Sequence, residues 1–174
     1  MIGKIGTIWG IMGVLLLLGS AVYRLIPLAI AAFSTPFSWF HWLAWGACIL
    51  FMAYAEGYRG FQLHFSPRVV ARARYLGEHP RVLHCLFAPL FCMGYFHAAR
   101  KRKIVSYSLT SGIVVLILAV HHLAQPWRGI IDAGVVIGLA WGIISIFWFT
   151  ARAFSGNSFD YSPEVPERST PTTH

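Results

Sequence analysis

Charged residues are scarce in this sequence. Asp, Glu, Lys and Arg make up 11% of its 174 residues, whereas hydrophobic residues make up 57%. Charged residues make up roughly a quarter of a typical soluble domain. The mean hydropathy of this chain is +0.62. The composition therefore excludes an ordinary soluble domain and predicts a single-domain integral membrane protein built from helices.

Among the charged residues, acidic ones are rarer than basic ones. The chain has six of them against fourteen Lys and Arg, a formal net charge of +8. Nine of the fourteen basic residues fall between Gly57 and Lys103 instead of being spread along the chain. Such a cluster is typical of a cytoplasmic loop that lies beside anionic lipid. We therefore expect anionic head groups as a partner, and no nucleic acid.

Cysteines and catalytic motifs are also lacking. Three cysteines, an odd number, give no disulfide framework. The sequence contains no H-E-x-x-H, no phosphate loop, no dinucleotide glycine fingerprint and no G-x-S-x-G. It therefore assigns no catalytic residue and no metal ligand, and it favours a non-catalytic protein.

Four apolar stretches are long enough to cross about 30 Å of hydrocarbon. They cover residues 5–32, 39–61, 104–123 and 130–149. The first resembles a signal peptide, but its apolar run is too long and is interrupted by Arg24, so we expect it to persist as a span. Residues 1–154 then form one transmembrane domain. The polar tail, residues 155–174, is predicted to be disordered and cytoplasmic.

The loop between the second and third spans, residues 62–103, is predicted to lie against the membrane. Residues 68–76 alternate apolar and basic residues at the helical period, which predicts an amphipathic surface helix. Residues 82–99 are apolar but short, and basic clusters flank them on both sides. A crossing there would leave one cluster outside. A re-entrant or interfacial hairpin is therefore favoured, with a fifth span as the alternative.

The basic residues also predict the orientation. With the 62–103 loop in the cytoplasm, four spans place both termini inside and two short turns outside, so that all basic clusters share one side. The residues expected to face lipid head groups there are Arg68, Arg72, Arg74, Arg100, Lys101, Arg102 and Lys103. We expect this arrangement in a bacterial inner (cytoplasmic) membrane.

Small residues predict how the helices pack. Gly134, Gly138 and Gly142 recur at four-residue spacing in the last span, and Gly6 and Gly10 form a similar pair in the first. Small residues at this spacing let another helix approach closely. The face of the last span should therefore contact another helix, within the chain or in a partner.

Two groups of polar residues could carry chemistry. His41, His121 and His122 fall at the outer ends of predicted spans. Histidines on facing helices bind haem b or a metal in helical bundles, although imidazoles are also common at a membrane interface. This group predicts, as a first alternative function, a haem- or quinone-associated electron-transfer subunit.

The second group contains Glu56, Arg59 and His64, with Arg24 and Asp132 as further charges in predicted spans. A carboxylate and an imidazole at a membrane boundary could serve acid–base work in an enzyme or transporter, or could simply anchor the helix. The remaining cytoplasmic residues lack the closely spaced pairs that zinc sites use: His79, His84, Cys85, Cys92 and His97.

The interpretation that these features favour is a small multi-pass membrane protein without catalytic activity. It would act as an accessory, assembly or scaffold component that packs against a membrane-protein partner or a second copy of itself.

Overall fold

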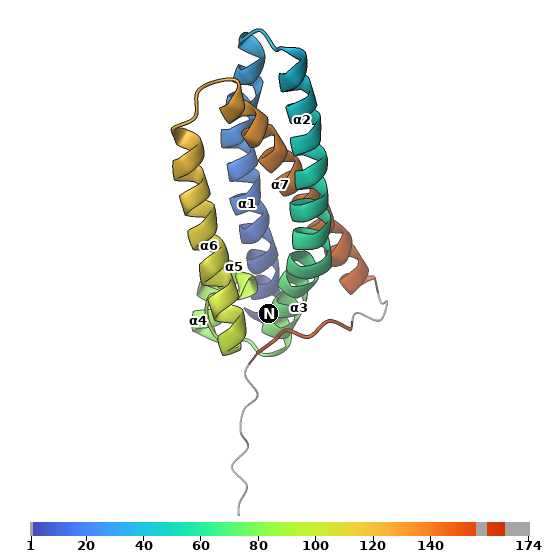
Figure 1. Cartoon of the computed structure of the whole chain (residues 1–174). Helices are drawn as coiled ribbons and strands as arrows, with labels where there is room; N and C mark the ends of the chain where they lie inside the picture. Colours follow the sequence, from blue (N-terminus) through green and yellow to red (C-terminus); the bar gives the residue numbers. More distant parts are fainter. Residues whose placement is uncertain (1, 156–159, 166–174) are drawn as a thin grey trace, which may run out of the picture.

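The computed structural model of the chain describes residues 2–155 and 160–165, without the side chains of Lys101, Arg102 and Leu109. All regular structure in this part is helical (Figure 1). The elements are α1 (Ile2–Ala31), the 3-10 turn η1 (Ala32–Ser34), α2 (Trp39–Met52), the π-helix η2 (Ala53–Phe65), α3 (Ser66–Glu78), α4 (Val82–Leu86), α5 (Ala88–Met93), α6 (Arg100–His121) and α7 (Trp127–Phe154).

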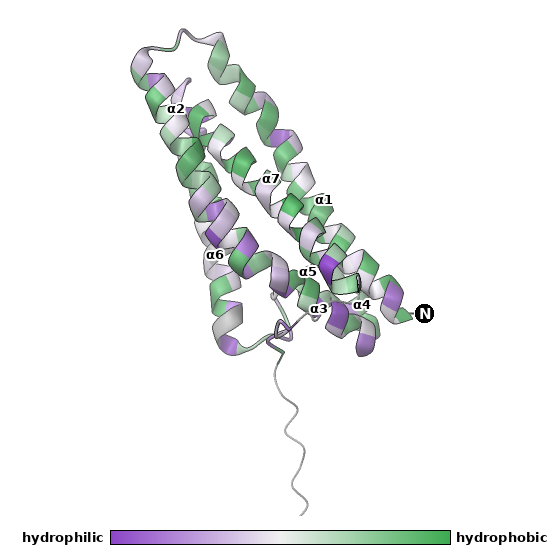
Figure 2. Cartoon of the chain, turned by 90° about the vertical axis from the view of Figure 1, so that its right-hand side faces the viewer, coloured by the Kyte–Doolittle hydropathy of each residue, from purple (hydrophilic) through white to green (hydrophobic). Residues whose placement is uncertain are grey.

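The long helices lie side by side along one axis, and the short helices α3, α4 and α5 gather at the end that carries the N-terminus (Figure 1). Three helices are long and apolar enough to cross a membrane: Ile2–Ser34, Lys103–His121 and Trp127–Phe154. Hydrophobic residues dominate these helices, and hydrophilic residues are concentrated around α3 and α4 (Figure 2). The predicted helical membrane protein is confirmed at this level.

The expected second span, residues 39–61, lies in a helix that changes its geometry. α2 has 14 residues, which is short for a crossing. The chain continues without a break through η2, a π-helix of 13 residues, into α3. π-Helices are rare and usually extend over a single turn, so this one is unusually long.

Interlocking aromatic rings and glycines accompany the π-helix. A Cβ built on Gly57 of η2 would lie 2.9 Å from the Trp141 ring of α7. In the reverse direction, a Cβ on Gly142 of α7 would lie 2.5 Å from the Phe61 ring. Trp141 also donates a 2.8 Å hydrogen bond from Nε1 to Gln62 Oε1. The two helices therefore approach closely because each offers a glycine to a ring of the other.

The main core lies at the N-terminal end of the bundle. α1, α3, α5 and α7 bury its side chains: Ile11, Val14, Leu15, Val69, Ala73, Leu76, Ala88, Phe91, Cys92 and Ile146. The glycines of α1 let this helix pack closely against α5. Cβ atoms built on Gly10 and Gly13 would lie 2.7 Å from Cys92 Sγ and 2.2 Å from Pro89 Cγ, respectively. The segment 82–99 is thus a pair of short helices packed on α1.

The predicted amphipathic segment forms α3, but α3 packs between α1, α5 and α7. Its apolar residues Val69, Val70, Ala73 and Leu76 are buried as the pattern predicts. Arg72 is buried too, with 2% of its surface exposed. The prediction that Arg72 faces lipid head groups is therefore wrong, because its guanidinium satisfies carbonyl groups inside the protein.

Residues 160–165, which we call the strap, are the described part of the tail that the sequence predicts to be disordered. The strap lies along α3, where Pro163 O accepts a 2.9 Å hydrogen bond from Arg72 Nη1 and Glu164 O accepts one of 3.2 Å from Ala99 N. Tyr161 packs edge-on against the Phe149 ring. The rest of the predicted tail, residues 156–159 and 166–174, lies outside the described residues.

Candidate functional site

Arg72 is the centre of the polar contacts at the N-terminal end of the bundle. Its Nε donates a 2.6 Å hydrogen bond to Phe91 O, and its Nη2 donates to Phe96 O at 3.0 Å and to His97 O at 3.2 Å. Nη1 reaches Pro163 O of the strap. The guanidinium also lies 4.3 Å from the centre of the Phe91 ring, within the range of a cation–π interaction.

The backbone after α5 explains why an arginine is needed here. α5 ends at Gly94, whose φ of 86° is left-handed, and His97 has a φ of 49°. Within this turn Gly94 N donates to Phe91 O and Tyr95 N donates to Leu90 O. The linker carbonyls of Phe96 and His97 lie beyond the end of the helix and accept from Arg72. One guanidinium, with five donors in a planar fork, can satisfy several carbonyls at once. Arg72 thereby holds together α5, the linker to α6 and the strap.

A cluster of rings surrounds this arginine. The His84 ring stacks on the Phe91 ring at 5.0 Å and lies 4.8 Å from the His97 ring. Burial lowers the pKa of His84 below its ordinary value, and the positive charges of His97, Arg81 and Arg72 lower it further. The cluster therefore favours a neutral His84 at neutral pH.

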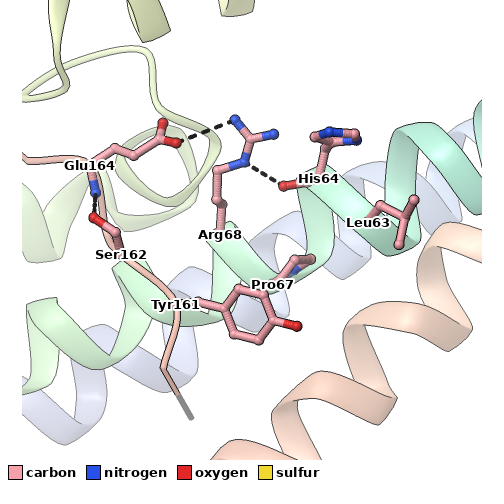
Figure 3. Close-up of a pocket in the computed structure, with 7 residues that line it drawn as sticks. All are labelled: Leu63, His64, Pro67, Arg68, Tyr161, Ser162 and Glu164. Atoms are coloured by element: carbon pink, nitrogen blue, oxygen red, sulfur yellow. Dashed lines mark hydrogen bonds and ion pairs between the residues drawn. The ribbon is translucent and has the colours of Figure 1, made fainter.

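An open groove of about 270 Å³ lies between α3, the end of η2 and the strap (Figure 3). Arg68 projects between two partners. Its Nε donates to His64 O at 2.5 Å, and its Nη1 lies 3.7 Å from Glu164 Oε1. The groove thus joins a basic side chain to apolar walls, and its lining residues are Leu63, His64, Pro67, Arg68, Tyr161, Ser162 and Glu164.

Arg68 and Arg74, two other predicted lipid-facing residues, each have an acidic partner. Arg74 Nη2 lies 3.9 Å from Glu78 Oε1, and the Arg74 side chain is 38% exposed. Arg100 is exposed and Lys103 is half-buried in the first turn of α6. The side chains of Lys101 and Arg102 lie outside the described residues.

The predicted polar group of Glu56, Arg59, His64, Arg24 and Asp132 is not brought together. His64 Nδ1 lies 2.6 Å from Arg59 O, but no ion pair joins Glu56 to Arg59 among the described residues. A π-helical turn takes more residues than an α-helical one, so two residues three apart do not stack. Asp132 pairs instead with Arg128, 3.8 Å away, and Arg24 is exposed.

The histidines predicted to lie at the outer ends of the spans also have separate partners. His41 Nδ1 accepts a 3.1 Å hydrogen bond from Ser38 N at the start of α2, and the His41 ring packs edge-on against Trp127 at 5.2 Å. His121 and His122 are exposed at the end of α6, with their rings 6.1 Å apart. No hydrogen bond or ring contact joins His41 to either of them in the described part of the chain, so the geometry adds nothing to the haem hypothesis.

The histidines and cysteines predicted to be cytoplasmic do not form a metal centre in the described part of the chain, where no three His, Cys, Asp or Glu side chains could hold one ion together. His79 stacks on Tyr75 at 4.7 Å. Cys85 and Cys92 face Gly6 and Gly10 of α1. These two cysteines therefore serve as small packing residues against the glycine face of α1.

The three glycines of α7 that were predicted to pack against another helix all contact the same neighbouring helix. Cβ atoms built on Gly134, Gly138 and Gly142 would meet Cys48, Glu56 and Phe61, respectively, at 2.7, 3.0 and 2.5 Å. The glycine face of α7 thus contacts the continuous helix of α2 and η2, within the chain.

Sequence reasoning missed the joint role of Arg72 and the strap. One signal was present, since Arg72 stands in a run of small and apolar residues that otherwise faces inward. An arginine in such a place is expected to satisfy buried carbonyls. The acceptors, however, come from segments far along the chain and have no sequence pattern of their own.

Fold and site together define a class: an all-helical protein, over its described residues, with three helices able to cross a membrane and a polar, arginine-centred assembly at one end. Comparison with protein-family models, with curated proteins and with solved structures found no match to this chain. Its function is therefore argued from its own geometry.

Proposed function

We propose that the chain crosses a bacterial inner membrane four times, through α1, the α2–η2 helix, α6 and α7, with both termini in the cytoplasm. The turns that join α1 to α2 and α6 to α7 lie at one end of the bundle, and the arginine-rich helix α3 lies at the other (Figure 1). Basic residues mark the cytoplasmic side of a membrane protein. The continuous helix from Trp39 supplies the fourth crossing.

The same proposal makes α4 and α5 a re-entrant hairpin. Pro89 of α5 contacts Gly13 of α1, which lies 11 residues beyond the start of α1, or about 16 Å along the helix axis. That depth is about half the hydrocarbon thickness. Irregular backbone at this depth must be covered by protein, and Arg72 provides the donors for it.

Labelling from the two sides of the membrane tests this topology. Ser34 and Glu78 are both exposed, at opposite ends of the bundle. In a variant whose native cysteines are replaced by alanine, we expect Ser34→Cys to react with a membrane-impermeant maleimide from outside intact cells. Glu78→Cys should react only after lysis. Labelling of both from the same side would contradict four spans.

The role that we propose is that of a non-catalytic accessory component that binds a partner helix through α6. The observation that carries it is a small, polar face on α6: Ser108, Ser111 and Gly112 are all exposed. A Cβ built on Gly112 would meet nothing within 4 Å. Lipid chains give hydroxyl groups no partner, whereas small and hydroxyl-bearing residues are enriched where membrane helices meet.

In the part of the chain that the structure describes, side-chain hydrogen bonds attach the first half of α6 to the bundle, and Val120 is buried near its end. Ser106 Oγ donates a 3.2 Å hydrogen bond to Met93 O, and Tyr95 Oη hydrogen-bonds to Thr110 Oγ1. Residues 111–119 are all exposed. This half of α6 therefore offers its whole circumference to lipid or to another helix.

Size measurements after extraction in mild detergent test the role. We expect the wild-type protein to migrate as an assembly larger than one chain, with itself or with a partner. Gly112→Leu should shift it to the monomer mass, because a bulky side chain prevents close approach.

Ile117→Leu is the matched control, since Ile117 is 60% exposed and lies on the opposite side of α6. It should leave the assembly intact. A wild-type protein that is monomeric throughout, or a Gly112→Leu variant that still assembles, would contradict the proposal. Gly138→Leu is unsuitable here because Gly138 contacts Glu56 within the chain.

A further inference from the structure

The strap and the basic side of α3 have opposite charges. Arg68 faces Glu164 across the groove (Figure 3). Their N–O distance is 3.7 Å, and their side chains remain 20% and 39% exposed. Exposed ion pairs of this kind contribute about 0–1 kcal/mol. The pair between Arg68 and Glu164 is therefore itself weak enough for another anion to replace Glu164 at this guanidinium.

The groove lies at the level of a membrane interface. Tyr161 of the strap contacts Phe149, five residues before the end of the candidate span α7. Exposed Trp148 and Phe154 and the basic Arg152 surround this end of the helix. Aromatic and basic residues are typical of the boundary between hydrocarbon and head groups. A ligand that reaches the groove from the side would therefore be a lipid.

The walls of the groove match the head-group region of an anionic phospholipid. Leu63, which is 49% exposed, provides apolar surface beside the guanidinium of Arg68. Arginine binds phosphate well because its planar fork can donate two parallel hydrogen bonds. The Nε donor of Arg68 is held by His64 O, which leaves the two terminal nitrogens directed toward Glu164 and the groove (Figure 3).

We propose that this groove binds the phosphate of an anionic membrane lipid at Arg68, and that the strap competes with the lipid through Glu164. When lipid binds, Glu164 leaves Arg68 and the strap loosens, while Pro163 O can keep its bond to the buried Arg72. The strap is thus a lid whose position depends on the lipid composition of the membrane. This inference depends on the membrane placement proposed above but not on a partner at α6.

Amide hydrogen exchange on the full-length protein in nanodiscs tests the proposal. The informative amides are those of the strap and of Ala99, whose N–H donates to Glu164 O. We expect their exchange to be roughly twofold to fivefold faster in dioleoylphosphatidylglycerol than in dioleoylphosphatidylcholine, the factor that corresponds to an ion pair of up to about 1 kcal/mol. Equal exchange in the two lipids would overturn the proposal, and it would leave the proposed role of α6 untouched.

Two variants locate the effect. In Arg68→Gln the strap should exchange faster in phosphatidylcholine, because the ion pair between Arg68 and Glu164 is gone, and phosphatidylglycerol should add nothing further. Arg74→Gln is the matched control on the same helix, since Arg74 pairs with Glu78 and does not line the groove. It should keep the full lipid response. A response that survives in Arg68→Gln, or that is lost equally in Arg74→Gln, would show a general surface-charge effect and overturn the site.

A further exchange measurement distinguishes a bound lipid from a free anion. Inorganic phosphate at millimolar concentration, added to phosphatidylcholine nanodiscs, should leave strap exchange unchanged because it lacks the acyl chains that hold the head group at the interface. A response equal to that of phosphatidylglycerol would replace the lipid by a soluble phosphate and contradict the proposal as stated.

Discussion

α6 and α7 are both long and apolar enough to cross a membrane, yet they are packed very differently. Over the most apolar part of each helix, 39% of the α7 residues are buried within the protein, against 12% of those in α6. α7 contacts α1, α2, η2 and α3. α6 meets the bundle at few places, among them Ser106, Thr110 and the buried Val120. Hydropathy therefore identifies both helices but does not distinguish a packed one from an exposed one.

The spacing of glycines makes the distinction. Every glycine from Gly134 to Gly142 in α7 has a side chain of α2 or η2 within contact distance, whereas Gly112 of α6 has nothing within 4 Å. Between helices in lipid the hydrophobic effect supplies no net attraction, so close packing of small residues decides which helices associate. α7 uses its small residues within the chain, and α6 leaves its own exposed.

The largest expected effect comes from breaking the anchor that holds the linker to α6. Arg72→Ala removes the hydrogen bonds that the guanidinium donates to the Phe91, Phe96, His97 and Pro163 carbonyls, of which Phe91 O keeps a second bond from Gly94 N. We expect a loss of roughly 3 kcal/mol or more of stability, in line with buried hydrogen bonds to a charged group. A thermal unfolding curve in detergent measures it.

Arg74→Ala provides the comparison for that experiment, because Arg74 is more exposed and its pair with Glu78 contributes at most about 1 kcal/mol. A melting temperature of Arg72→Ala as high as that of Arg74→Ala would mean that Arg72 is not an anchor.

Alanine at matched glycines tests the contrast between α7 and α6 directly. Gly142→Ala places a methyl group 2.5 Å from the Phe61 ring, and we expect it to cost about 1–3 kcal/mol through overpacking. Gly112→Ala meets open space and should be neutral or stabilising by up to about 1 kcal/mol, since alanine favours helix. The same thermal unfolding assay compares them, and equal effects would remove the basis of the distinction.

Much of this architecture could be predicted from the sequence. Apolar runs gave α1, α6 and α7 to within a few residues, because burial in lipid requires long apolar helices. The helical spacing of apolar residues in 68–76 predicted α3. The glycines predicted which faces of α1 and α7 pack closely against other helices. These features depend on local composition and spacing, which a sequence displays directly.

Other features could not be predicted because they depend on distant partners. The pattern of α3 placed Arg72 on its polar side, and only the carbonyls after α5 and those of the strap make an inward position favourable. Likewise Glu56 and Arg59 are well spaced for pairing in an α-helix, but the rings of Trp141 and Phe61 accompany a π-helix there. Both cases involve contacts between residues far apart in the sequence, which local spacing does not display.

A smaller effect is expected where α6 joins the bundle. Tyr95→Phe removes the hydroxyl that hydrogen-bonds to Thr110 Oγ1, which is worth about 1 kcal/mol. We expect amide exchange around Thr110 to rise up to about fivefold without a change elsewhere. Tyr107→Phe is the control, because the Tyr107 side chain is 56% exposed and its hydroxyl has no hydrogen bond in the described part of the chain. If both variants exchange alike, α6 is held by something other than this bond.

The smallest effect concerns pH and the same linker. The pKa of His84 is lowered by burial and by the charges of His97, Arg81 and Arg72, so the unfolded chain binds a proton more readily than the folded one. The free energy of unfolding is therefore not reduced by His84 above the ordinary histidine pKa of about 6.5, and it decreases as the pH falls below that value. Between pH 7.5 and 5.0 we expect the melting temperature of the wild type to fall more than that of His84→Gln, which cannot be protonated. An identical pH dependence in the two proteins would show that His84, and with it the contact to the linker before α6, does not respond to protonation.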